Sequence, residues 1–214
     1  MTVVDDGSRD GTAEVARAHA GRLPVGVIVH PRNQGLARAM ETGLRAVLAD
    51  ADPDDMIVTM DADNTHPPDL IPVMIQHVHE GADLVIASRY VPGGREEGVP
   101  LIRRVLSDGI GILMRARFGL KGVRDYSSGY RAYRARGLQA ALERYGEALI
   151  QSRGFTVTAE LLLKVHPFAP RVVEVPLRLR YGAKLGESKM PVAASILGYL
   201  QLLLRGSRVD VRTG

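Results

Sequence analysis

Short apolar runs rich in β-branched residues alternate along the chain with longer segments whose apolar residues recur at helical spacing. This alternation is typical of β–α–β units and predicts an α/β fold. The runs predict strands at residues 2–4, 25–30, 56–60, 84–87 and 172–180. Pro176 indicates that the last strand lies at a sheet edge, because proline has no amide hydrogen to donate. The helical spacing predicts helices at residues 11–20, 35–49, 67–79, 102–118, 137–145, 158–165 and about 192–205, the last of them amphipathic.

The chain of 214 residues is 45% hydrophobic, which fits one globular domain over residues 1–214. It has no cysteine, so disulfides, zinc–thiolate sites and thiol nucleophiles are excluded, and a reducing compartment is favoured. We find no signal-peptide pattern. We also find no apolar run of the roughly 20 residues that a membrane-spanning helix needs.

The net charge of +4 comes mainly from arginine, since only four of the 28 basic residues are lysine. Planar guanidinium groups suit phosphates and carboxylates. The sequence has no basic run and no basic patch rich in aromatic residues, which argues against nucleic acid as a partner. The composition therefore favours anionic small molecules or a membrane surface.

A first acidic cluster, residues 3–12, follows the first predicted strand. Carboxylates at the carboxyl end of a strand lie where open α/β sheets bind ligands. A calcium loop is a weaker interpretation, because Arg17 stands at the twelfth position, where that loop needs a glutamate. A tight turn that caps the next helix remains the stronger alternative.

Asp61 and Asp63 follow the predicted buried strand 56–60. Two carboxylates at this spacing can reach one ion, and their oxygens suit Mg²⁺ or Mn²⁺. Such an ion keeps positions open for a diphosphate and neutralises the charge on a leaving nucleotide. His66 is either a further ligand or, more commonly in such a position, a turn residue.

These clusters are two of several motifs in which the chain resembles glycosyltransferase family 2, and within it the dolichol-phosphate (polyprenyl-phosphate) mannosyltransferase branch. The resemblance rests on residues 3–12, 33–35 with Ala39 and Gly43, 61–63 with 65–68, 87–94, 103–104 with Ser107, 128–131 with Tyr133, 174–176 and 186–189. Because these motifs come in the family's order over nearly the whole chain, they are far more specific together than any one alone.

The resemblance implies a GT-A fold, in which helices flank a mostly parallel sheet. It implies transfer of a hexose, with inversion, from a nucleotide-diphosphate sugar to a polyprenyl phosphate. GDP-mannose is the expected donor, and UDP-glucose is the second choice. The implied location is cytoplasmic, at the cytoplasmic face of a membrane, on the lipid surface or on a small membrane subunit.

The resemblance also assigns residues to roles. The nucleotide sugar would be held by Asp5, Asp6, Gly7, Ser8, Asn33 and Gly35. The metal would be held by Asp61 and Asp63, which with Asp125 and Arg131 form the expected catalytic group. Asp125 would position an arginine or act as a base, the first role being favoured. The acceptor phosphate and the closing loop would involve Arg89, Arg103, Ser107, Ser188 and Lys189.

The chain departs from the family pattern at three places. Relatives carry a strand and a helix before the first acidic motif, so we expect a sheet that lacks this strand. Ala183 stands where the branch often has arginine, and Thr65 where some relatives have glutamine. An inactive remnant that binds only lipid or a partner is therefore the alternative. A nucleotidyltransferase is disfavoured, because no glycine-rich phosphate loop is seen near the N-terminus.

Overall fold

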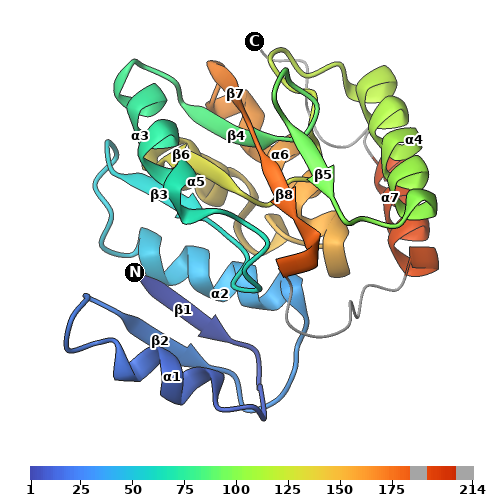
Figure 1. The fold of residues 1–214 in the computed structure, drawn as a ribbon. Coiled ribbons are helices and arrows are strands. Elements are labelled where there is room, and N and C mark those ends of the chain that lie inside the picture. The colour runs from blue at the N-terminus through green and yellow to red at the C-terminus, as the bar shows by residue number, and fades with distance from the viewer. Residues whose placement is uncertain (184–191, 206–214) are drawn as a thin grey trace.

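The computed structural model describes residues 1–183 and 192–205 (Figure 1). Its helices are α1 (Thr12–Ala18), α2 (Leu36–Leu48), α3 (Ile71–His79), α4 (Leu101–Phe118), α5 (Ala135–Tyr145), α6 (Val157–Val165) and α7 (Val192–Arg205). Its strands are β1 (Thr2–Asp5), β2 (Gly26–Val29), β3 (Met56–Thr59), β4 (Leu84–Ser88), β5 (Arg95–Glu97), β6 (Arg131–Arg134), β7 (Val172–Pro176) and β8 (Arg178–Arg180). Each predicted helix is present, and the α/β class is confirmed.

The central sheet has four strands in the order β3-β6-β4-β7. Strands β4 and β7 are parallel, as predicted, whereas β6 runs antiparallel to both β3 and β4. Strand β6 was not among the strands that the sequence predicted. Strand β7 lies at the sheet edge, as Pro176 indicated.

Side chains of β4 alternate between two buried clusters, one on each face of the sheet. Leu84 and Ile86 pack with α5, α6 and the end of α2. Val85 and Ala87 pack with Met74 and other residues of α3 and β7. Every residue of β4 is buried, so this strand is the centre of the core and gives the residues after it a fixed position.

Strands β1 and β2 form a separate parallel sheet. Among the described residues, β1 pairs only with β2, and β3 pairs only with β6. The β1–β2 sheet and the central sheet are therefore separate, as expected for a sheet that lacks the strand found in relatives. Helix α2 connects the parts, because Leu44 and Leu48 enter the main core while Gly43 lies against Val4 of β1 (Figure 1).

Strands β5 and β8 form a third, short parallel sheet. The sequence did not predict β5, and it placed β8 at the end of one long strand at residues 172–180. The sheet continues the edge of β7. The Leu177 amide donates to the Ser88 carbonyl, and the Arg95 amide donates to the Leu177 carbonyl. Among the described helices, none has the length and apolar character that would let it cross a bilayer.

Candidate active site

The first acidic cluster ties together the loops at the carboxyl ends of β1 and β2. One oxygen of Asp6 accepts hydrogen bonds from His30 Nδ1 (2.7 Å) and from the Gln34 amide, and the other accepts from the Gly35 amide. Burial alone would raise the pKa of Asp6, but these hydrogen bonds outweigh it and lower the pKa. Asp6 is therefore an ionised anchor that positions the entry to α2.

The other predicted nucleotide-binding residues lie around this anchor. Asp5 is buried, and its carboxylate accepts the Ser8 amide at 2.8 Å. Gly7 has φ +74°, and a Cβ there would stand 2.6 Å from the Arg32 carbonyl carbon. Only glycine allows the two loops to approach so closely. Asn33 is exposed and lies next to this contact. The residues predicted to bind the nucleotide sugar therefore lie together at the carboxyl ends of β1 and β2.

Asp61 and Asp63 lie in a tight turn after β3. Asp63 accepts hydrogen bonds from the Thr65 hydroxyl (2.6 Å) and amide, and Asn64 adopts φ +63° between them. His66 accepts the Asp61 amide through Nδ1 and stacks on Tyr130. Burial lowers the pKa of His66, although Asp61 and Asp63 oppose the shift. A neutral imidazole that accepts a backbone amide is a turn residue, as we favoured.

A cavity of about 240 Å³ brings residues from both halves of the sequence together. Its polar lining includes Asp61, Asp63, His66, Arg89, Glu96 and Ser107, and its apolar lining includes Val99, Leu106, Ile110, Leu177, Leu179 and Tyr199. The nucleotide-side residues of the first cluster are not among its lining residues. The cavity therefore joins an acidic turn, an arginine and an apolar wall.

Arg89, the first residue after β4, is held by Asp125 in a two-pronged ion pair. Its Nε and Nη2 each donate to a different Asp125 oxygen at 2.9 Å, and Nη2 also donates to Ser127. Asp125 further accepts the amides of Arg89, Ser127 and Ser128. Burial opposes ionisation of Asp125, but Arg89 and these amides outweigh it and hold its pKa at about 2.

This geometry supports the positioning role of Asp125 and disfavours the alternative role as a base. A carboxylate with such a low pKa and filled hydrogen-bonding positions accepts a proton poorly near neutral pH. Arg89, in turn, has its pKa raised by Asp125 despite burial, so it stays charged. The pair thus presents a fixed cation to the cavity.

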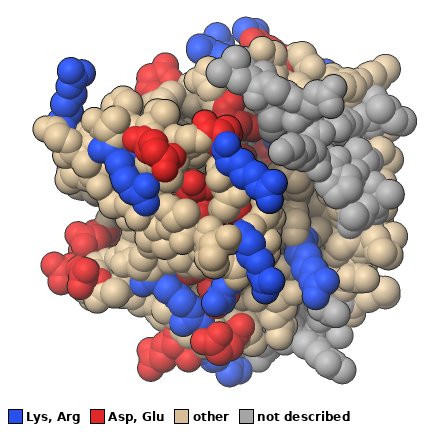
Figure 2. Space-filling model, turned by 90° about the horizontal axis from the view of Figure 1, so that it is seen from below, with Lys and Arg blue, Asp and Glu red and all other residues tan. Residues whose placement is uncertain are grey.

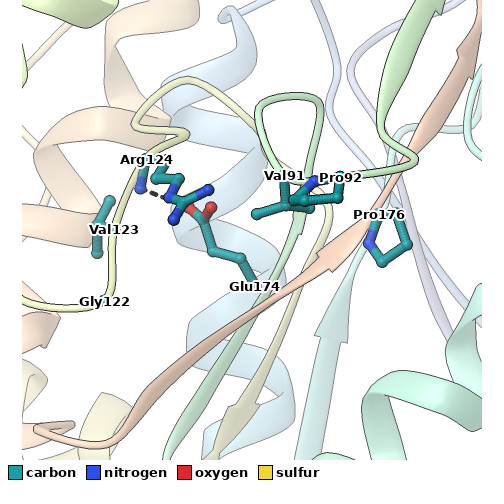
Figure 3. A pocket seen from close by; sticks show the side chains of 7 residues that line it. All are labelled: Val91, Pro92, Gly122, Val123, Arg124, Glu174 and Pro176. Atoms are coloured by element: carbon teal, nitrogen blue, oxygen red, sulfur yellow. Dashed lines mark hydrogen bonds between the residues drawn. The ribbon is translucent and has the colours of Figure 1, made fainter.

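Glu174 on β7 supports the loop that carries Asp125. One Glu174 oxygen accepts the amides of Arg124 and Asp125 at 2.6 and 2.8 Å. Figure 3 shows Glu174 hydrogen-bonded to Arg124, and both line an open hollow of about 550 Å³ together with Val91 and Pro92. This hollow has few polar groups, so the cavity with the aspartate pair is the better candidate site.

Ser107 of α4 lines the cavity, and its hydroxyl lies 3.4 Å from the Tyr90 hydroxyl. Burial raises the pKa of Tyr90 to about 12, so the phenol stays neutral. The backbone of Arg103 forms part of α4, but the side chain of Arg103 lies outside the described part of the structure. Ser188 and Lys189 also lie outside the described residues.

Arg131, which we assigned to the catalytic group, is the first residue of β6. Its side chain is fully buried and is not among the lining residues of the cavity. It donates to the carbonyls of Thr158 (2.6 Å) and Tyr126 (3.0 Å). Arg131 therefore connects the sheet, α6 and the 125–129 loop, and its catalytic role stays a prediction.

Glu96 is a charged residue of the cavity that the sequence did not reveal. It lies on β5, pairs with Arg89 through Nη1 at 2.5 Å and has only 8% of its side chain exposed. Its two neighbours in the strand are exposed, which is the period-two alternation of a strand. Three residues of alternation inside a glycine-rich loop were too short a signal to recognise.

Among the described residues, no group of three or more His, Asp or Glu side chains is arranged to hold a metal ion. Two carboxylates beside a cavity still fit a Mg²⁺ or Mn²⁺ ion that takes its remaining oxygens from a diphosphate and water. On the face shown in Figure 2, basic side chains lie among acidic ones.

The α/β fold and the aspartate turn are the features expected of glycosyltransferase family 2, and comparison with known families supports this assignment. The family model described as "Glycosyl transferase family 2" matches residues 1–142. The chain therefore belongs to glycosyltransferase family 2, as we predicted.

Individual relatives show which members of the family the chain resembles. The chain is 34% identical over 208 residues to a dolichol-phosphate mannosyltransferase of Pyrococcus furiosus, a match that covers 96% of this chain and 54% of the relative. It is 37% identical over 191 residues to an undecaprenyl-phosphate mannosyltransferase of Micrococcus luteus, covering 89% and 75%. The chain thus spans about half the length of the Pyrococcus relative.

Solved structures support the fold. Glucosyl-3-phosphoglycerate synthase from Mycobacterium tuberculosis, solved with Mn²⁺, UDP-glucose and phosphoglyceric acid, matches with a TM-score of 0.66 and 20% identity. The match covers 98% of this chain and 68% of that one. At this identity the likeness concerns the fold, and it confirms the predicted GT-A architecture.

We expect Asp125→Asn to lower the free energy of unfolding by about 3–5 kcal/mol at neutral pH, because it leaves a buried arginine without its main partner. Since the folded pKa of Asp125 is about 2 and its ordinary value is 3.8, its stabilisation is complete above about pH 4 and is lost toward pH 2. Urea unfolding should therefore show a gap between variant and wild type that narrows below pH 4. A constant gap, or one no larger than that of the exposed Glu97→Gln, would contradict this.

Proposed function

We propose that this chain transfers a hexose from a nucleotide-diphosphate sugar to the phosphate of a polyprenyl lipid, with inversion at the sugar carbon. Family membership supports glycosyl transfer. The two relatives described above are named for mannose transfer to dolichol phosphate and undecaprenyl phosphate. Their names support a lipid phosphate as the acceptor and mannose as the transferred sugar.

The observation that carries the proposal is the composition of the cavity beside the aspartate turn. Asp61 and Asp63 line it together with Arg89, and its wall from α4, β8 and α7 is apolar. A phosphate with an attached hydrocarbon chain needs a cation and an apolar surface side by side. A transferase that used a small polar acceptor would have no need of this wall.

The acceptor phosphate requires little proton chemistry. A phosphate monoester has a second pKa near 6 and is largely a dianion at neutral pH, so its oxygen can attack the sugar carbon directly. The remaining task is to hold two anionic groups near each other. Arg89 and Ser107 would hold the attacking phosphate, while Asp125 keeps Arg89 charged and in place.

Asp61 and Asp63 would hold Mg²⁺ or Mn²⁺ against the donor diphosphate. A bound divalent ion neutralises the charge that develops on the leaving nucleoside diphosphate. His66 keeps the turn in shape by accepting the Asp61 amide. Asp5, Asp6 and the close contact at Gly7 would shape the nucleotide side.

GDP-mannose is the donor we propose, with UDP-glucose as the second choice. The mannosyltransferase relatives favour the first. The neighbour of known structure was solved with UDP-glucose, but at 20% identity it bears only on the fold.

We further propose that the protein works at the cytoplasmic face of a membrane, against lipid or a small membrane subunit. Leu101, Val105 and Ile112 form an exposed stripe on α4, and Leu197, Leu200 and Leu204 form another on α7. The two helices lie in contact (Figure 1). Tyr199 and Leu202 of α7 are buried instead, so the helix has both a packing face and an exposed apolar face.

Purified full chain should transfer radiolabelled mannose from GDP-mannose to a polyprenyl phosphate when Mg²⁺ or Mn²⁺ is added. UDP-glucose should serve less well, and chelation should stop the reaction. Labelled product with water or a soluble sugar phosphate as acceptor, and none with the lipid phosphate, would overturn the acceptor assignment.

Asp63→Asn should lower the transfer rate by about 100-fold or more, because it weakens the site for the ion that stabilises the leaving group. Asparagine keeps the side-chain oxygen that accepts from Thr65, so the thermal unfolding midpoint should hardly change. The exposed Asp69→Asn is the control, with wild-type rates expected. Full activity of Asp63→Asn in the presence of chelator would refute the metal assignment.

The double variant Leu200→Glu, Leu204→Glu should float less with liposomes that contain anionic lipid, because it places charge on the exposed face of α7. Val15→Glu is the control, since Val15 is also an exposed apolar residue but lies on α1. Transfer to a short, water-soluble prenyl phosphate should be unchanged in both variants. Equal flotation of wild type and double variant would show that α7 is not the membrane contact.

A further inference from the structure

The arginine that should receive the acceptor phosphate already holds a second carboxylate. Besides its pair with Asp125, Arg89 donates through Nη1 to Glu96, which comes from a different element, β5. Of the five guanidinium hydrogens of Arg89, four point at these two carboxylates and at Ser127. Little of its donor capacity is left for a phosphate.

The charges around Arg89 do not balance. One arginine faces two carboxylates, Asp125 and Glu96, so the group carries a net negative charge. A phosphate dianion that enters with Glu96 still in place would meet like charge at close range, which disfavours its binding. Asp125 cannot be the group that leaves, because it is fully buried and holds several backbone amides.

Glu96 is held much more weakly than Asp125. It is bonded through one oxygen, and its other oxygen, Oε2, is buried without a hydrogen-bond partner in the described structure. A buried carboxylate oxygen without a partner is unfavourable, so the Glu96–Arg89 contact is less stable than its charge suggests. Its strand, β5, has only three residues and pairs with the equally short β8.

We propose that Glu96 is a built-in competitor for the acceptor phosphate: it occupies Arg89 when the acceptor is absent and must be displaced for a phosphate to bind. This rests on the proposed function, since it assumes that Arg89 receives the acceptor. Displacement lowers the affinity for every anion by the same factor. Weakly binding anions, such as the phosphodiesters of ordinary membrane lipids, are thereby kept out of the site.

Strand geometry places this carboxylate at the cavity and gives a matched control. Successive residues of a strand point to opposite faces. Arg95 and Glu97 pair with each other on the outer face, 57% and 46% exposed, whereas Glu96 points inward. Glu96→Gln and Glu97→Gln therefore remove the same charge from adjacent positions, one facing Arg89 and the other facing solvent.

The test is calorimetric titration of wild type, Glu96→Gln and Glu97→Gln with inorganic phosphate and with citronellyl phosphate. Glu96→Gln should bind both ligands about tenfold more tightly, as expected when a charge-assisted competing bond becomes a neutral one. The factor should be the same for both ligands, because displacement is independent of what replaces Glu96. Glu97→Gln should match wild type, and binding of the nucleotide sugar should be unchanged in both.

In steady-state assays, Glu96→Gln should lower KM for the prenyl phosphate and leave KM for the donor unchanged. Glu96→Met, which also removes the charge, serves as a second variant in case glutamine disturbs folding. If wild type binds citronellyl phosphate and neither Glu96 variant binds it more tightly, the competitor role is wrong while the proposed function stands. If no variant binds either phosphate, Arg89 is not the acceptor site and both proposals fail.

Discussion

The ion pair of Arg89 and Asp125 is the interaction on which the rest of the site depends. It joins the end of β4, the most buried strand, to the loop before β6. Glu174 fixes that loop from β7, and Arg131 fixes it from below through the Tyr126 carbonyl. An arginine held on several sides loses little freedom when it binds an anion, which is the condition for a preorganised site.

The same pair explains how the cavity can keep a buried cation, Arg89, at its wall. Burial of a single guanidinium would be strongly unfavourable, but Asp125 offsets it, and the pKa shifts of the two groups keep both ionised. Asp125, which stabilises Arg89, also reduces the positive electrostatic potential that Arg89 presents to the cavity. Glu96 reduces this potential further. The contact between Glu96 and Arg89, which lies outside the ion pair, is therefore where we propose that anion binding is controlled.

The sequence predicted the helices, strands β1 to β4 and β7, and the aspartate turn, because each has a strong local signal: helical periodicity, a β-branched run or closely spaced carboxylates. It did not predict β6, whose four residues include two arginines and whose strand character comes from pairing with β3 and β4. The position of the Arg131 side chain could not be predicted for the same reason. A motif gives the residue, but only the tertiary structure shows that its side chain reaches the carbonyls of Tyr126 and Thr158 and not the cavity.

Hydrogen bonding to backbone amides separates the carboxylates of this fold by task. Asp6 and Asp125 each accept two or more backbone amides, which lower their pKa values and fix a loop. Asp61 and Asp63 line the cavity instead, Asp61 being exposed and Asp63 partly buried. A carboxylate whose positions are filled by amides has no room for an ion, whereas a partly solvated pair can exchange water for one. The aspartates that we propose for a divalent ion are therefore those at the cavity, and Asp6 and Asp125 serve by holding the arginine and the loops around them.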